Sequence, residues 1–222
     1  MSRGPRVQLP GLIRHITSRG NARMRIFLDD LDYRHFMFML GEIVERFALQ
    51  CWNYCAMPNH YHLTVTPTDW NLSEAIRQLN AGYAQWWNKR HDRVGHVFQG
   101  RFKAQIVQAD DYLLNVCRYV AKNPVRSGLV DRPEEWPWSS YAAIAGLRDC
   151  PAFLQSALTL QMFGEEDLHV SMQRFSVYVT NEADVDTENR IRSNEPILGD
   201  RPFKCEVVAR LSSAAASTPV YR

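Results

Sequence analysis

Two histidines, His60 and His62, are the side chains of this 222-residue chain best suited to chemistry. Residues two apart on a β-strand point to the same face, with Cα atoms about 6 to 7 Å apart. Two imidazoles at that spacing can converge on one cation. The flanking segments 51–55 and 63–66 contain many β-branched and aromatic residues, and Pro58 with Asn59 predicts a turn between them. The pattern predicts a hairpin with a possible metal site, although paired histidines on a strand are also common as ordinary surface residues.

A second group of chemical side chains lies about sixty residues later. Asp110 is a suitable N-cap, apolar residues then recur at helical spacing, and Pro124 is expected to end the helix. Tyr119 and Asn123 are four residues apart and therefore share a face of that helix. They offer a nucleophile and an oxygen ligand to a two-histidine site. Tyr112, seven residues before Tyr119 and nearly on the same face, is a rival nucleophile.

These blocks occur together with Gly95–Lys103 between them and Trp136–Tyr141 after them. In this order they resemble the REP-associated tyrosine transposases, which are single-tyrosine members of the HUH endonuclease superfamily. The resemblance extends from about residue 12 to residue 141. It implies a metal-dependent single-strand DNA endonuclease and strand transferase that acts on hairpin-forming repeats. Asparagine at position 123, where the wider insertion-sequence family often has glutamine, is usual among the REP-associated members.

The resemblance also implies a role for each site residue. Tyr119 would become joined to a DNA 5′-phosphate, while His60, His62 and Asn123 would bind Mg²⁺ or Mn²⁺. A tyrosine with an ordinary pKa near 10 is a poor nucleophile at neutral pH unless its target phosphate is polarised. Mixed imidazole and amide-oxygen ligation suits Mn²⁺ and accommodates Mg²⁺. His15 and His96 lie in segments that could line the same site.

The distribution of charge indicates where a polyanion would bind. The whole chain has a formal net charge of +2, but residues 77–126 contain 9 Lys and Arg against 3 Asp and Glu. Single-stranded or hairpin DNA is therefore the expected partner of this middle region. Four residues close to the motifs are candidates for phosphate contacts: Arg101, Lys103, Lys122 and Arg126. Nearby aromatic residues could stack on bases, although several of them are also candidates for the core.

The elements needed to position these residues can be read from periodicity. Strands are expected near residues 12–17, 50–56, 61–66 and 102–107, and helices near residues 30–47, 72–88 and 111–123. The resulting order, β-α-β-β-α-β, predicts an α+β fold of the ferredoxin-like split βαβ type, with an antiparallel sheet and helices on one face. The HUH family has this same architecture.

Composition divides the chain into two expected parts. Residues 1–145 form the HUH-like catalytic domain, and residues 146–222 form a mostly helical extension with a partly disordered tail at 212–218. No stretch has the roughly 20 apolar residues that cross a bilayer, and no signal peptide is recognisable. We therefore expect a cytoplasmic protein without a membrane partner, associated with the nucleoid when bound to DNA. Monomer and homodimer both remain open.

Two alternatives come from other classes of function. Cys51 and Cys55, expected on one face of a strand, could join His60 and His62 in a structural zinc site of a binding module. The protein could also bind repeat DNA as an architectural factor without cutting it. The five cysteines are odd in number and scattered, so they do not predict a disulfide framework.

Overall fold

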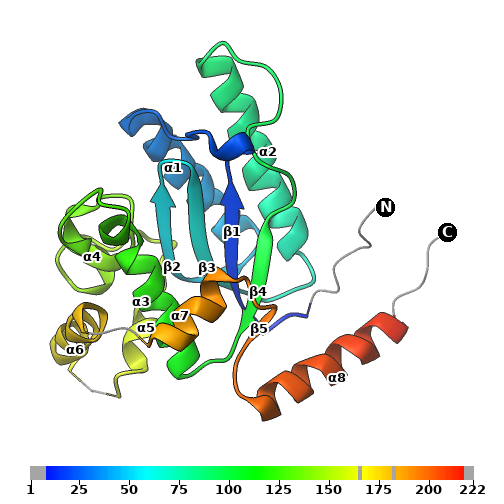
Figure 1. Cartoon of the computed structure of the whole chain (residues 1–222), viewed down its shortest axis with the longest axis vertical. Helices are drawn as coiled ribbons and strands as arrows, with labels where there is room; N and C mark the ends of the chain where they lie inside the picture. The colour runs from blue at the N-terminus through cyan, green and yellow to red at the C-terminus, as the bar shows by residue number, and fades with distance from the viewer. Residues whose placement is uncertain (1–8, 165–166, 182–183, 218–222) are drawn as a thin grey trace.

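A five-stranded sheet is the centre of the computed structural model, which describes residues 9–164, 167–181 and 184–217 (Figure 1). The strand order is β2-β3-β1-β4-β5. Strands β1 to β4 pair with one another in antiparallel fashion, and β5 is parallel to β4. This order interleaves two βαβ units and confirms the predicted fold class. The strands are β1 (Ile13–Arg19), β2 (Leu49–Met57), β3 (His60–Pro67), β4 (Lys103–Val107) and β5 (Ile197–Leu198).

The first three long helices cover both faces of the sheet. Tyr61 of β3 points toward α1 (Asp30–Arg46) and α2 (Leu72–Arg90), because its hydroxyl donates to Asn80 and its ring contacts Phe36. His62, the next residue, points the other way and meets Tyr119 of α3 (Asp111–Arg126). The expectation of helices on one face therefore holds for α1 and α2 only. Since side chains alternate along β3, its buried residues require cover on both faces.

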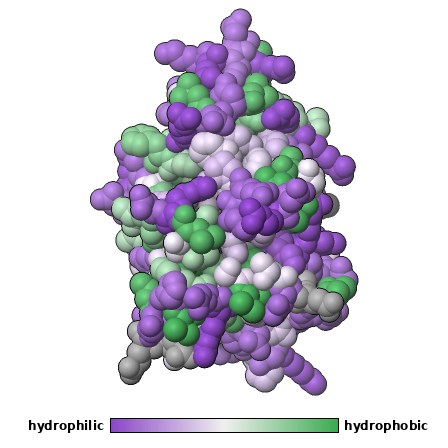
Figure 2. Space-filling view, turned by 90° about the vertical axis from the view of Figure 1, so that its left-hand side faces the viewer, coloured by the Kyte–Doolittle hydropathy of each residue, from purple (hydrophilic) through white to green (hydrophobic). Residues whose placement is uncertain are grey.

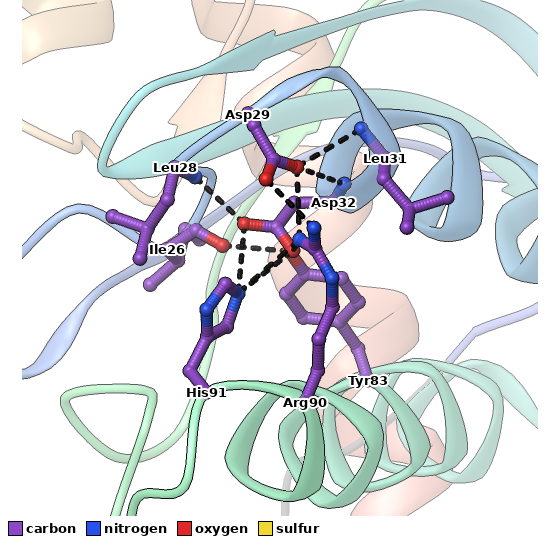
Figure 3. A network of polar contacts seen from close by, with 8 residues as sticks. All are labelled: Ile26, Leu28, Asp29, Leu31, Asp32, Tyr83, Arg90 and His91. Carbon is purple, nitrogen blue, oxygen red and sulfur yellow. Dashed lines mark hydrogen bonds and ion pairs between the residues drawn. The ribbon is translucent and has the colours of Figure 1, made fainter.

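A polar network fastens the start of α1 to the end of α2 (Figure 3). Asp29 caps α1 by accepting hydrogen bonds from the backbone N–H groups of Leu31 and Asp32. Arg90 forms ion pairs with both aspartates, at 2.7 Å from Asp29, and His91 contacts the fully buried Asp32 at 2.9 Å. The network lies over a core of aromatic rings that includes Phe27, Phe36 and Tyr83.

Helices α6 (Leu168–Thr180) and α7 (Val185–Arg192) from the second half of the chain pack against α3. In Figure 1, α7 lies beside α3, and the two helices are in contact. Residues on both sides of position 145 contribute to one hydrophobic cluster, which includes Phe175 and Leu198. The shorter elements of the chain are the 3-10 helices η1 (Asn21–Arg23) and η2 (Pro133–Glu135), and the later helices are α4 (Tyr141–Ile144), α5 (Ser156–Gln161), α6 (Leu168–Thr180), α7 (Val185–Arg192) and α8 (Arg201–Ser217).

Two helix ends differ from the expectation. Pro124 lies inside α3, which continues to Arg126. Residues 212–217, expected in a disordered tail, end α8, while residue 218 lies outside the described part of the chain. Alanine favours helix, and Leu211 and Ala214 pack against the cluster that contains Leu9 and Leu12, which explains the added order.

The surface mixes polar and apolar residues. On the face shown in Figure 2, apolar residues are scattered among hydrophilic ones and form no single dominant patch. Within the described ranges, none of the helices is long and apolar enough to span a bilayer.

Candidate active site

The register of the sheet places the predicted chemical residues on the face covered by α3. His62 pairs with Thr17 of β1, and Thr17 pairs with Lys103 of β4. Paired residues of antiparallel strands point to the same side of a sheet. Lys103, Thr17 and His62 therefore lie side by side across this face of the sheet. Two residues further along the strands, His60 lies beside Arg19 on the same face.

His62 lies at the centre of this face and is buried. Its Nδ1 is 3.0 Å from His15 Nε2 and 3.2 Å from Thr17 Oγ1. Its Nε2 is buried and has no hydrogen-bond partner within the described structure. Burial, followed by electrostatic interactions with His60, His15 and Arg19, lowers the pKa of His62 well below its usual value. The ring is therefore neutral at pH 7, and one of its nitrogens is free for a ligand.

His60 is less buried than His62 and lies beside it. The two ring centroids are 4.9 Å apart, with the planes at 81°. His60 Nδ1 is 2.6 Å from Asn59 Oδ1, which leaves Nε2 as its other polar atom. Burial, with a smaller contribution from Arg19, lowers the pKa of His60 to about 4. Both histidines of the predicted pair are thus neutral imidazoles at pH 7, the form that binds metal ions.

Tyr119 packs against this pair from α3. Its ring centroid is 5.6 Å from that of His62, at an interplanar angle of 87°, and 6.3 Å from that of His15. The rival Tyr112 has different partners: its hydroxyl accepts from Arg190 at 3.3 Å, and the same guanidinium lies over its ring. Of the two tyrosines on α3, only Tyr119 contacts the rings of the site.

Asn123 is buried one helical turn after Tyr119. Its Nδ2 donates to the Tyr119 carbonyl at 2.8 Å, so its Oδ1 is turned away from that backbone group. An amide oxygen and two neutral imidazoles form a donor set that a divalent cation can use. The unpartnered Nε2 of His62 fits that use, since a buried polar atom without a partner is otherwise costly.

The zinc alternative does not fit the geometry of β2. A bulge between Cys51 and Asn53 shifts the register, so Cys51 pairs with Val65 and Cys55 pairs with His62. Val65 and His62 are three residues apart on β3 and point to opposite faces. The two cysteines therefore lie on opposite faces, contrary to the expectation. Burial also raises the pKa of both thiols, which disfavours the thiolate that binds zinc.

The four basic candidates occupy different environments. Arg101 is exposed just before β4, and Lys103 is exposed at the first residue of β4, on the site face. The Nζ of Lys122 donates to the Asn181 carbonyl at 3.3 Å. Arg126 donates to the Tyr119 carbonyl at 3.1 Å and forms an ion pair with Glu188 of α7. The first two are therefore accessible cations, whereas Arg126 is engaged inside the protein.

The aromatic residues of the middle region belong mainly to the core. Tyr83, Trp87, Phe98 and Phe102 are buried, and Trp86 stacks on His35 with a centroid distance of 3.9 Å. Phe98 and Phe102 line a cavity of about 560 Å³ between α2 and the loop before β4, together with the exposed His96. This cavity is on the α2 side, so His96 does not join the histidine pair.

Most of the contacts that surround His62 cannot be found from the sequence. The sequence suggests only that the segment of His15 could line the site, and it does not indicate that Thr17 or Gln105 contacts the histidines. Gln105 Oε1 lies 3.0 Å from His15 Nδ1. Alternation along β1 places residues 13, 15 and 17 on one face, but their partners depend on strand order and register. The sequence shows neither before the sheet is known.

Comparisons with known proteins agree with this arrangement. The family model described as "Transposase IS200 like" matches residues 9–123, more than half of the chain. A protein of Haemophilus influenzae described as a REP-associated tyrosine transposase is 25% identical over 146 residues, which cover 58% of this chain and 83% of that protein. The solved structure of a REP-associated tyrosine transposase bound to a REP hairpin has a TM-score of 0.56 at 18% identity, and the match covers 69% of this chain and 90% of that one. This structural likeness shows a shared fold. The chain therefore belongs to the IS200-like transposase family, and its resemblance to the REP-associated tyrosine transposases is confirmed.

Proposed function

We propose that this protein cuts and rejoins single-stranded DNA at hairpin-forming repeats, with Tyr119 as the nucleophile. The observation that carries the proposal is the contact between the Tyr119 ring and His62, whose buried Nε2 has no partner among the described residues. Family membership supports the reaction class. The substrate is proposed by analogy with the solved relative, which is bound to a REP hairpin.

In the proposed reaction, the Tyr119 oxygen forms a bond to the scissile phosphorus while the bond from phosphorus to the 3′ oxygen breaks. The phenol loses its proton, and the departing 3′ oxygen takes one up. A later 3′-hydroxyl displaces Tyr119 from the DNA 5′-phosphate, so rejoining requires no external energy source. Mg²⁺ or Mn²⁺ bound by His60, His62 and Asn123 would polarise the phosphate. The protein contributes two neutral imidazoles and a tyrosine held by α3.

The accessible cations of β4 suit the DNA backbone. Lys103 is exposed in the same row of the sheet as His62 and two strands away, at roughly 10 Å. We include Arg101, Lys122 and Arg126 as further phosphate contacts, with Arg126 requiring release from Glu188. Such contacts supply affinity and sensitivity to salt more than sequence choice.

The test is formation of a covalent protein–DNA adduct. The protein is incubated with single-stranded hairpin DNA and Mn²⁺, and a denaturing gel separates the adduct from free DNA. Tyr119→Phe should abolish the adduct and still bind the hairpin, whereas Tyr112→Phe should retain it. An adduct that survives in Tyr119→Phe would remove Tyr119 as the nucleophile. Tight hairpin binding by the wild type with no adduct in Mg²⁺ or Mn²⁺ would instead identify an architectural DNA-binding protein.

A further inference from the structure

Three buried side chains form a connected row beside the proposed cation site. Gln105 of β4, His15 of β1 and His62 of β3 are all at most 5% exposed. Gln105 Oε1 lies 3.0 Å from His15 Nδ1, and His15 Nε2 lies 3.0 Å from His62 Nδ1. Each contact joins neighbouring strands, so the sheet itself sets the spacing of the row.

The orientation of the Gln105 amide follows from its backbone partners. Its Nε2 faces the carbonyl oxygens of Glu195 at 2.9 Å and Arg190 at 3.4 Å. Because carbonyl oxygens only accept hydrogen bonds, the nitrogen must be on that side. The oxygen therefore faces His15 and accepts a hydrogen bond from its Nδ1–H. Burial disfavours a charged ring, so His15 with its proton on Nδ1 presents a lone pair at Nε2.

The contact between the two histidines lies in the plane of both rings. The ring planes differ by 7°, and the centroids are 5.2 Å apart. Stacked rings keep their atoms about 3.5 Å or more apart, so a nitrogen–nitrogen distance of 3.0 Å between parallel rings requires an edge-to-edge arrangement. This geometry directs a hydrogen bond from His62 Nδ1–H to the lone pair of His15 Nε2.

We propose that Gln105 and His15 are positioning residues, which keep the proton of His62 on Nδ1 and leave Nε2 as the ligand nitrogen of the cation site. The inference rests on the proposed function for the identity of that site. The backbone carbonyls of Arg190 and Glu195 fix the orientation of the Gln105 amide, and this orientation determines which atom donates in each hydrogen bond of the row. Thr17 Oγ1, 3.2 Å from His62 Nδ1, can accept or donate and so does not choose the tautomer.

The first test reads the tautomers directly in the metal-free wild-type protein. Long-range nitrogen–proton NMR spectra of protein labelled with nitrogen-15 histidine distinguish protonated from unprotonated ring nitrogens. His62 and His15 should each be protonated on Nδ1 and unprotonated on Nε2. A His62 protonated on Nε2 would overturn the proposal, whether or not the protein cuts DNA.

The second test breaks the row at Gln105. Gln105→Leu leaves His15 Nδ1–H without an acceptor, so both histidines should populate mixed tautomers, and the affinity for Mn²⁺ alone should fall by about tenfold or more in calorimetry. The matched control is Gln108→Leu, which removes the same kind of side chain from a contact with Asp200 elsewhere on the C-terminal segment.

These measurements test the positioning role of Gln105 and His15 independently of whether the protein cuts DNA. Altered tautomers and weaker Mn²⁺ binding in Gln105→Leu, but not in Gln108→Leu, support a positioning role for Gln105 and His15, even if no DNA is cut. Unchanged tautomers and Mn²⁺ affinity in Gln105→Leu would refute it, even if the wild type forms the adduct. An equal loss of affinity in Gln108→Leu would also refute it, because loosening of the C-terminal segment would then be the cause.

Discussion

At the scale of single residues, Asn123 is a candidate metal ligand that also contacts the backbone of Tyr119. Its Nδ2 donates to the Tyr119 carbonyl at 2.8 Å, and its Oδ1 is the proposed third donor to the cation. Asn123→Asp keeps an oxygen, whereas Asn123→Leu removes both functions. We expect Asn123→Leu to lower Mn²⁺ affinity by at least about tenfold and Asn123→Asp to retain binding, as measured by calorimetry. Wild-type affinity in Asn123→Leu would exclude this residue as a ligand.

The residues of the site differ in how well the sequence reveals them. His60, His62, Tyr119 and Asn123 are related by short spacings within one strand or one helix, and the local period determines which side chains share a face. His15 joins His62 from 47 residues away, and Gln105 joins His15 from 90. Such partners depend on strand order and register, which no local pattern encodes.

At the scale of elements, the buried Asp32 connects α1 to α2. It accepts from the Leu28 N–H at 2.7 Å and contacts Arg90 and His91 (Figure 3). Asp32→Asn removes the charge that these partners share, and we expect a loss of about 3 kcal/mol in the free energy of unfolding. Urea denaturation measures it. Asp30→Asn, which affects an exposed pair with Arg34, should cost less than about 1 kcal/mol. Equal effects would contradict a special role for the network.

The same network predicts a dependence on pH. The hydrogen bond from Arg90 is the main reason that the pKa of Asp29 falls to about 2 from its ordinary 3.8. Because the folded pKa is the lower one, protonation favours the unfolded chain. The contribution is therefore present above about pH 4 and disappears as the pH falls toward 2. Asp29→Asn keeps an N-cap acceptor but no charge.

The gap in urea midpoint between wild type and Asp29→Asn should accordingly be small at pH 7 and close below pH 3. It should be small because the Asp29 side chain is 51% exposed, so solvent weakens the pair. A gap that widens on acidification would show that Asp29 stabilises the fold by another route.

The regular elements could be predicted where pattern and capping residues agree. Asp110 caps α3 as expected, and Asp29 caps α1. The bulge in β2 that separates Cys51 from Cys55 could not be predicted, because it depends on pairing with β3. The final turns of α8 could not be predicted either, since their order comes from packing against residues 9 and 12.

At the scale of the whole molecule, the C-terminal segment packs against the elements that carry the candidate site. Strand β5 extends the sheet beside β4, and Glu188 of α7 pairs with Arg126 at the end of the tyrosine helix. Composition predicts a division near residue 145, but it does not predict that the later segment packs back against the elements of the site. A segment with a net negative charge thus partly neutralises the basic region from which the proposed DNA contacts come.

If DNA binds as proposed, the exposed cations of the site face should supply much of the affinity. Lys103 is exposed on the site face of β4, whereas Arg34 is exposed on α1, which covers the opposite face. Removing one cation that binds a phosphate should reduce the slope of log affinity against log salt by about 0.7 for single strands and about 0.9 for a duplex stem. Lys103→Ala should therefore weaken hairpin binding, more strongly at low salt, and flatten the slope by nearly one. Arg34→Ala should leave both unchanged. Fluorescence anisotropy across a salt series measures the slopes, and equal slopes for wild type and Lys103→Ala would place the DNA elsewhere on the protein.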